Sequence, residues 1–250
     1  MWRVIADYHT HTKYSHGTGT ILDNAREAKK QGLEVLGIAD HGPANWGHIA
    51  TTGLEAFDQI IAETRRVEAE ISGLKILAGT EANLISYDGE LDIPLSMQRK
   101  LDQVLAGFHV TVKPKQLRDG VKFATHWALA RLSPSLRRKA RADNTKAMTA
   151  AIYNNEIDII THPGLNISID TTELARACVK RGTALEINAK HGVKSIAFIQ
   201  AAAKEGARFA IGSDAHQPDQ VGRLGSGMAA ARQAGLQPDQ IMNVIETDAN

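Results

Sequence analysis

The stretch RVIADYHTHTKYSHG, residues 3–17, joins a short apolar run to the three histidines His9, His11 and His16. The run 3–9 is too short for a core helix, and its near-continuous apolarity predicts a strand buried on both faces. Side chains two residues apart on a strand point to the same face. His9 and His11 can therefore bind one cation from the end of this strand, so the stretch predicts a buried strand that ends at a metal-type site.

Similar apolar runs recur along the chain and alternate with helical patterns. The further runs cover residues 33–41, 74–82, 102–109, 157–163, 183–189 and 208–216, and the helical patterns cover 21–32, 53–73, 144–156, 170–182, 193–206 and 221–235. Strict alternation of strand and helix is typical of parallel strands joined by crossover helices. We therefore predict an α/β fold with seven strands, formed by a single domain over residues 1–250.

Most of the predicted strands end in a side chain that can bind metal. Besides the first, these strand-end residues are His41, Glu81, His109, His162, Asp214 and His216, and His16 lies in the loop after the first strand. The carboxyl ends of barrel strands carry the functional residues of such folds. One strand-end histidine alone is more often solvent-facing or hydrogen-bonded, but burying this many imidazoles without partners would be costly. Together they predict metal binding.

Nine ligand-type residues are too many for one ion. Zinc usually takes about four ligands, so the set predicts two or three divalent ions, with zinc favoured and manganese or iron as alternatives. Clustered divalent ions mostly hydrolyse phosphate esters with a metal-activated water, and the sequence identifies no catalytic group beyond that water. Lys190, just past the run 183–189, is a candidate substrate contact, although an exposed surface lysine is the plainer interpretation.

Composition limits the other classes of function. The 250 residues are 43% hydrophobic with a formal net charge of +1, which argues against a chain built mainly to coat nucleic acid. Cys178 is the only cysteine, so an intrachain disulfide and a cysteine-based zinc finger are excluded. Residues 1–8 are too polar for a signal peptide, and no run of about 18 apolar residues occurs. We expect a cytoplasmic protein without a membrane partner.

Residues 113–146 form a basic excursion on an acidic remainder, with ten basic and two acidic side chains. Pro134 lies between helix-like pieces and predicts a compact excursion instead of one long helix. Two interpretations stay open: a solvated surface, or a lid whose cations attract an anionic substrate to the site.

The quoted residues give the sequence a clear resemblance to the PHP (polymerase and histidinol phosphatase) family. The segments that carry it are DYHTHTKYSHG, GIADHGP, GTEANL, GFH, THPG and GSDAH, spread over residues 7–216. The chain is most similar to the single-domain bacterial phosphatases of this family. The resemblance implies a distorted (βα)7 TIM-like barrel with a trinuclear metal site.

The resemblance also implies how the ligands divide among the ions. His9, His11, Glu81 and Asp214 would hold the first ion, and Glu81 would bridge to the second. His109 and His162 would complete the second, and His16, His41 and His216 would hold the third.

Three hypotheses about function follow. The first is a metal-dependent phosphoesterase that hydrolyses a small phosphomonoester, of which histidinol-phosphate phosphatase is a specific version. The second is a metal-dependent nuclease acting on DNA or RNA ends, which the basic excursion favours because it could contact phosphates. The third is a binding module that uses its metals as a scaffold. The oligomeric state is left open.

Overall fold

Seven parallel strands form one sheet in the order of the sequence. The computed structural model describes residues 1–109, 112–129, 133–165, 167–190 and 196–247. The strands are β2 (Ala6–Thr10), β3 (Val35–His41), β4 (Lys75–Asn83), β5 (Gln103–Gly107), β6 (Ile159–Ile160), β7 (Ala184–Asn188) and β8 (Phe209–Gly212). A parallel bridge between Thr10 and Ala215 brings the two edges together, and the His11 N–H donates to the Ala215 carbonyl at 2.8 Å. The sheet is thus a nearly closed barrel, which confirms the predicted fold class.

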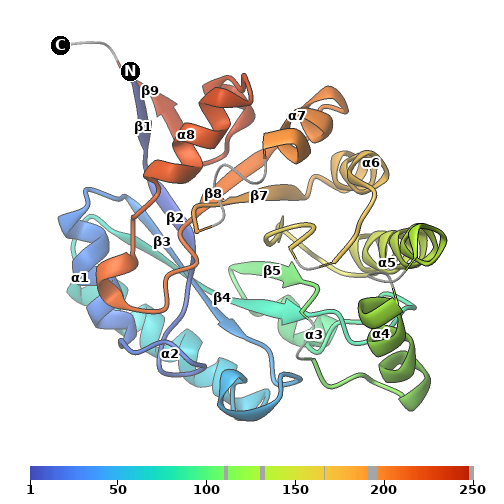
Figure 1. Ribbon diagram of the computed structural model, residues 1–250. Helices are drawn as coiled ribbons and strands as arrows, with labels where there is room; N and C mark the ends of the chain where they lie inside the picture. The colour runs from blue at the N-terminus through green and yellow to red at the C-terminus, as the bar shows by residue number, and fades with distance from the viewer. Residues whose placement is uncertain (110–111, 130–132, 166, 191–195, 248–250) are drawn as a thin grey trace.

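The first predicted strand is divided in two, which corrects the prediction of one strand over 3–9. Its first part, β1 (Trp2–Val4), pairs antiparallel with β9 (Val244–Glu246) in a separate two-stranded sheet. Ile5 links the two sheets, because its N–H donates to the Asn243 carbonyl at 2.9 Å and its carbonyl accepts from the Val35 N–H of β3 at 3.1 Å. The first and the last strand of the chain therefore lie side by side, as Figure 1 shows.

Helices surround the barrel on its outer face (Figure 1). They are α1 (Ile21–Lys30), α2 (Glu55–Glu70), α3 (Leu95–Gln98), α4 (Leu117–Leu129), α5 (Pro134–Asn154), α6 (Thr171–Arg181), α7 (Ile196–Lys204) and α8 (Gly225–Gln233), with the short 3-10 turns η1 (Gly47–Ile49), η3 (Pro218–Gln220) and η4 (Pro238–Gln240). Residues 193–195 of the predicted helix 193–206 lie outside the described residues. Among the helices in the described ranges, none is long and apolar enough to cross a bilayer.

Local signals in the sequence explain where several helices begin and end. Thr20 and Asp23 form a reciprocal capping box at the start of α1, which satisfies backbone N–H groups that the helix leaves unpaired. The Asp170 side chain caps α6 by accepting from the Glu173 N–H, and Gly182 ends this helix at φ +73°, a conformation that glycine adopts without strain.

The core has two layers that reflect the two faces of the sheet. The larger layer mixes strand and helix residues, for example Ile76 and Phe57, and lies between the barrel and its helices. The smaller layer contains residues of strands only, and it fills the barrel interior: Ala39, Leu105, Ile159, Ala184 and Ala210. Alanine at three of these five positions leaves room above them for larger polar side chains at the carboxyl end of the barrel.

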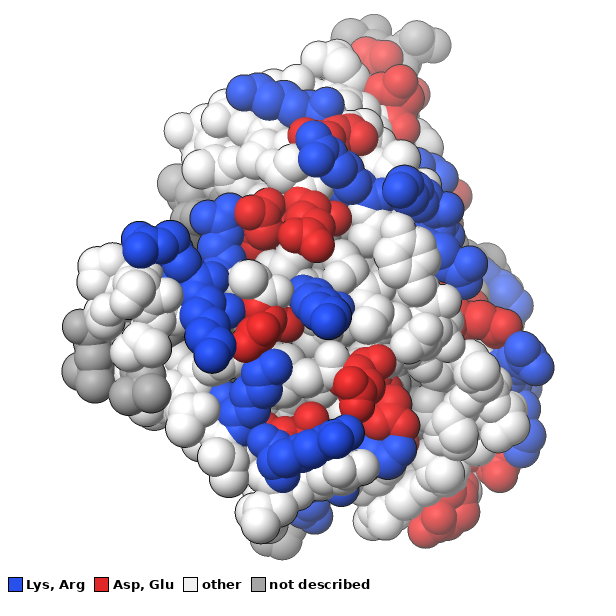
Figure 2. Space-filling model, turned by 90° about the vertical axis from the view of Figure 1, so that its right-hand side faces the viewer, with Lys and Arg blue, Asp and Glu red and all other residues white. Residues whose placement is uncertain are grey.

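The basic excursion contains α4 and the first part of α5, which continues to Asn154. Pro134 lies at the first turn of α5. The helix predicted over 144–156 therefore begins ten residues earlier, because proline suits a first helical turn and does not interrupt it there. Several basic side chains of the excursion pair with carboxylates: Lys115 with Glu90, Arg118 with Asp88, Lys122 with Asp143 and Arg141 with Asp170. Figure 2 shows the side of the molecule on which α4 and α5 lie. On this side Lys and Arg are interspersed with Asp and Glu, and they do not form an unbroken basic surface.

Candidate metal centre

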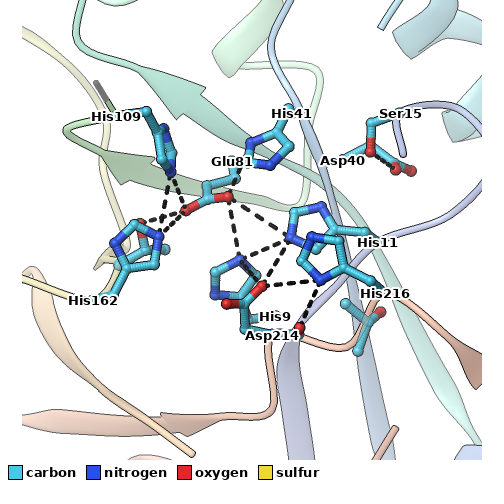
Figure 3. Close-up of polar contacts among 12 residues, drawn as sticks. His9, His11, Ser15, Asp40, His41, Glu81, His109, His162, Asp214 and His216 are labelled. Carbon is cyan, nitrogen blue, oxygen red and sulfur yellow. Dashed lines mark hydrogen bonds and ion pairs between the residues drawn. The ribbon is translucent and has the colours of Figure 1, made fainter. Parts of the chain in front are cut away.

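All nine predicted ligand-type residues meet at the carboxyl end of the barrel, most of them visible in Figure 3. Only His9, His41 and Glu81 lie within strands. His109, His162, Asp214 and His216 lie in the loops just past β5, β6 and β8, so the predicted strands 102–109, 157–163 and 208–216 were too long. After β6 and β8 the backbone departs from the extended conformation, with His162 at φ +27° and Asp214 at φ +53°. Such positive values cost about 1–3 kcal/mol each and cluster at functional sites.

The Glu81 carboxylate lies at the middle of the cluster and is almost completely buried. Its Oε1 lies 2.9 Å from His162 Nε2 and 3.2 Å from His109 Nε2. Its Oε2 lies 3.3 Å from His9 Nε2 and 3.1 Å from His41 Nδ1. Oε2 also lies 3.7 Å from His11 Nε2. The two carboxylate oxygens therefore face different sets of imidazoles (Figure 3).

Asp214 forms a second carboxylate position on the other side of His9 and His11. Its Oδ1 lies 3.4 Å from His11 Nε2, 3.8 Å from His9 Nε2 and 3.4 Å from His216 Nδ1. His16 completes the group through ring contacts, with its centroid 4.1 Å from that of His216 and 5.0 Å from that of His41. The two carboxylates thus lie among seven imidazoles.

The loop that carries His16 is held by Asp40, a buried residue next to His41. Its carboxylate accepts from the Thr12 N–H at 2.8 Å and from the Thr12 and Ser15 hydroxyls at 2.6 and 2.5 Å. These bonds fix the turn after β2 and so place His16 over the cluster.

The donor set fits metal ions. His9 Nε2 lies 3.1 Å from His11 Nε2, and His109 Nε2 lies 3.3 Å from His162 Nε2. The nitrogens of two neutral imidazoles that approach in this way repel each other unless a proton or a cation lies between them. In addition, the buried Nδ1 atom of His11 has no hydrogen-bond partner, and the buried Nδ1 atom of His41 faces Glu81 Oε2 at 3.1 Å without forming a hydrogen bond to it. Buried polar atoms are normally satisfied, so a cation explains both observations.

The environment keeps several of the imidazoles neutral. Burial lowers the pKa of His11 to about 3 and that of His16 to about 4, and it places the pKa of His41 well below its ordinary value. Burial acts in the same direction on His9, but the carboxylates of Glu186, Glu81 and Asp214 outweigh it and raise the pKa of His9 well above the ordinary value. Neutral imidazoles offer a lone pair to a metal. On His9, where the neighbouring carboxylates favour the protonated ring, a metal cation can take the place of the proton.

Three sets of ligand atoms in the described residues lie mutually within 4.8 Å. They are His9 with His11 and Asp214, His41 with Glu81 and His109, and His11 with His41 and His216. The first set is contained in the ligands expected for the first ion. The second set contains His41 where His162 was expected. The third set contains His11 where His16 was expected. The division of the nine residues among the ions therefore stays a prediction.

Two polar residues that orient the imidazoles were not identified in the sequence. Glu186 of β7 places Oε1 2.6 Å from His9 Nδ1, and its Oε2 accepts from the His162 N–H at 2.7 Å. Asn83 of β4 places Oδ1 2.8 Å from His109 Nδ1. Glu186 carried a usable signal, because a carboxylate inside the apolar run 183–189 is costly to bury without a partner.

We expect Glu186→Gln to weaken metal binding about 10- to 100-fold, because partners that orient a metal-binding histidine usually contribute that much. Competition with a chromogenic chelator measures the affinity. Glu205→Gln is the matched control, because Glu205 pairs with Arg176 on the surface. Equal affinity in Glu186→Gln and the control would show that Glu186 does not position His9.

Lys190 lies at the edge of the cluster, as the sequence predicted for a substrate contact. Its Nζ lies 2.9 Å from His216 Nδ1 and 3.5 Å from Asp214 Oδ2. The side chain is partly exposed, so its ammonium group faces both the ligand-type residues and solvent.

Comparisons with known proteins agree with this geometry. The PHP domain model matches residues 7–221. A probable phosphatase of Thermoanaerobacter sp. (strain X514) is 34% identical over 96% of this chain and 91% of its own length. The probable phosphatase YcdX of Escherichia coli O127:H6 is 30% identical over 95% and 89%. A histidinol phosphate phosphatase of Lactococcus lactis subsp. lactis, solved with zinc, L-histidinol and phosphate, has the same fold with a TM-score of 0.62 at 15% identity, over 93% of this chain and 94% of that one.

Proposed function

This chain belongs to the PHP domain family and is a phosphatase-type hydrolase, and from that premise we propose that it hydrolyses a small phosphomonoester at a multinuclear centre of divalent metals. The observation that carries the proposal is the position of Glu81, whose two oxygens face different sets of imidazoles. That arrangement suits a carboxylate shared by two ions.

The nine residues His9, His11, His16, His41, Glu81, His109, His162, Asp214 and His216 would hold two or three ions, with zinc favoured and manganese or iron as alternatives. When bound, such ions acidify a water molecule to a nucleophile and neutralise the oxygens of the phosphate.

The chain itself contributes orientation and charge. Glu186 and Asn83 fix the rings of His9 and His109 through their outer nitrogens. The Lys190 ammonium would donate a hydrogen bond to a phosphate oxygen, because it lies at the exposed edge of the centre, 2.9 Å from His216. A charged donor of this kind anchors a phosphate without taking part in bond breaking.

Ion pairing of the basic excursion argues for a phosphatase over a nuclease. Four of its ten basic side chains pair with Asp88, Glu90, Asp143 and Asp170. Long-range attraction of a polyanion depends on unpaired positive charge.

The proposed function predicts metal-dependent release of phosphate from p-nitrophenyl phosphate. Protein treated with chelator should lose this activity and regain it with zinc or manganese. A single-stranded DNA substrate assayed beside it should be cut far more slowly. Preferential cleavage of DNA would favour the nuclease, and metal-loaded protein that hydrolyses neither substrate would favour a scaffold.

The same centre predicts about three metal ions per chain when it is saturated, from about four ligands for each ion with shared carboxylates. Elemental analysis after reconstitution and gel filtration measures this ratio. His162→Ala should retain less metal than His126→Ala, because only His162 contacts Glu81. A saturated value of one ion or fewer would contradict the multinuclear centre.

A further inference from the structure

A large apolar pocket lies beside the metal centre, between the basic excursion and the loops after β3, β4 and β5. Its volume is about 700 Å³, which falls in the range of about 300–1,000 Å³ for pockets that enclose a whole drug-sized ligand. Aromatic side chains make up much of its wall: Trp46, Tyr87, Phe108, Phe123 and Trp127.

The aromatic wall is a packed arrangement of side chains from separate segments. The Phe123 ring of α4 lies 4.8 Å from that of Tyr87 and 5.2 Å from that of Phe108, centroid to centroid. The Tyr87 hydroxyl also lies 2.9 Å from His126 Nδ1 and donates to Asn144 Oδ1 at 3.0 Å. These contacts hold α4 and α5 against the barrel loops, so the pocket is formed before a ligand enters.

The pocket and the metal centre share one residue. His109 lines the pocket, and its Nε2 lies 3.2 Å from Glu81 Oε1. A molecule whose phosphate lies at the metals can therefore extend its organic part past His109 into the pocket.

The charges around the pocket limit what that organic part can be. In the described part of the chain, neither Asp nor Glu lines the pocket, whereas Arg137 does. Lys113 Nζ lies 5.4 Å from the Trp46 ring, and Lys122 Nζ lies 4.0 Å above the Tyr87 ring while it also pairs with Asp143 behind the wall. An ammonium group on the substrate would find no Asp or Glu among the described residues that line the pocket, and it would share the pocket with the Arg137 side chain.

We infer that the pocket binds the organic part of the phosphomonoester and that this part is an uncharged aromatic ring system larger than one ring. The inference rests on the proposed function for the position of the phosphate. Flat rings stack edge-to-face or offset on aromatic side chains, which adds to the free energy gained by burying their apolar area. The volume of the pocket selects fused or linked rings over a single ring.

The test compares 2-naphthyl phosphate with phenyl phosphate, two aryl esters whose leaving groups are of the same kind. In the metal-loaded wild type, kcat/KM should be at least about tenfold higher for the naphthyl ester, since each tenfold corresponds to about 1.4 kcal/mol. Phe123→Ala should reduce this preference about five- to tenfold, as expected when one aromatic contact is lost. Val121→Ala is the matched control, because Val121 is an exposed apolar residue of the same helix outside the pocket wall.

Isothermal titration of 2-naphthol into the metal-loaded protein gives a second result that does not depend on turnover. Binding that is weakened by Phe123→Ala and not by Val121→Ala supports the pocket even if neither ester is hydrolysed, in which case only the proposed function fails. Hydrolysis of both esters with equal kcat/KM, together with no binding of 2-naphthol, overturns the pocket and leaves the phosphatase intact. Equal loss for both esters in Phe123→Ala, with fold and metal content unchanged, would also overturn it, because Phe123 would then make no contact that favours the larger ring.

Discussion

Glu81→Ala is expected to lower turnover of p-nitrophenyl phosphate by about 10³-fold or more. The carboxylate contacts His9, His41, His109 and His162, so in the proposed centre its loss would remove a ligand from two ions and the negative charge that screens their repulsion. Metal centres contribute several kcal/mol to transition-state stabilisation, and each 1.36 kcal/mol changes the rate tenfold. Steady-state kinetics and metal content measured on the same sample test this.

Two further variants separate the bridging role from a general loss of ligands. His16→Ala should lose less activity, because His16 reaches the cluster only by ring contacts at its edge. Glu156→Ala is the control for removal of a carboxylate, since Glu156 is exposed and pairs with Arg99. Near-wild-type rates in Glu81→Ala, or a larger loss in His16→Ala, would show that Glu81 does not bridge.

The barrel could be predicted from the sequence because its strands are marked locally. The runs are largely apolar and six of the seven are followed by a helical pattern, so alternation indicates parallel strands. The exception is the run 74–82, after which the structure has only the short helix α3. The lengths of the strands were less certain, since β6 pairs over only Ile159–Ile160. A strand ends where the neighbouring strands no longer offer backbone hydrogen-bond partners. The sequence of the strand itself does not contain that information.

The terminal sheet shows why part of the fold was missed. Val244–Glu246 carries no strand signal by itself, and it pairs with Trp2–Val4 from the opposite end of the chain. Such a contact depends on where the barrel places the two termini. The aromatic pocket has the same origin, because Tyr87, Phe108 and Phe123 belong to three segments that meet only in the folded chain.

The cluster of ligand-type residues was easier to predict, because parallel strands share one carboxyl edge and any side chains that end them must meet there. All nine predicted residues do gather at that edge. Glu186 does not end a predicted strand, because this carboxylate reaches His9 from within β7. Residues that orient ligands need only be near them, so no fixed position in a strand marks them.

Lys190→Met is expected to lower kcat/KM for phosphomonoesters about 10- to 100-fold. A hydrogen bond to a charged group contributes about 1.5–3 kcal/mol, and the Lys190 ammonium lies within 3.5 Å of Asp214 at the open edge of the centre. Methionine keeps the length of the side chain and removes the charge, and Lys180→Met on the exposed end of α6 is the matched control.

The alternative role for Lys190 is to hold Asp214 and His216 in place, and metal content distinguishes the two roles. If Lys190 binds the phosphate, Lys190→Met keeps its metal ions while KM rises, and Lys190→Arg recovers part of the loss because the positive charge is restored. If Lys190 only supports the two ligand-type residues, metal content falls together with kcat, and inorganic phosphate inhibits the variant as strongly as the wild type once metal is resupplied. Unchanged kinetics with unchanged metal content would assign Lys190 to the solvated surface, because a charge that contacts the substrate cannot be removed without cost.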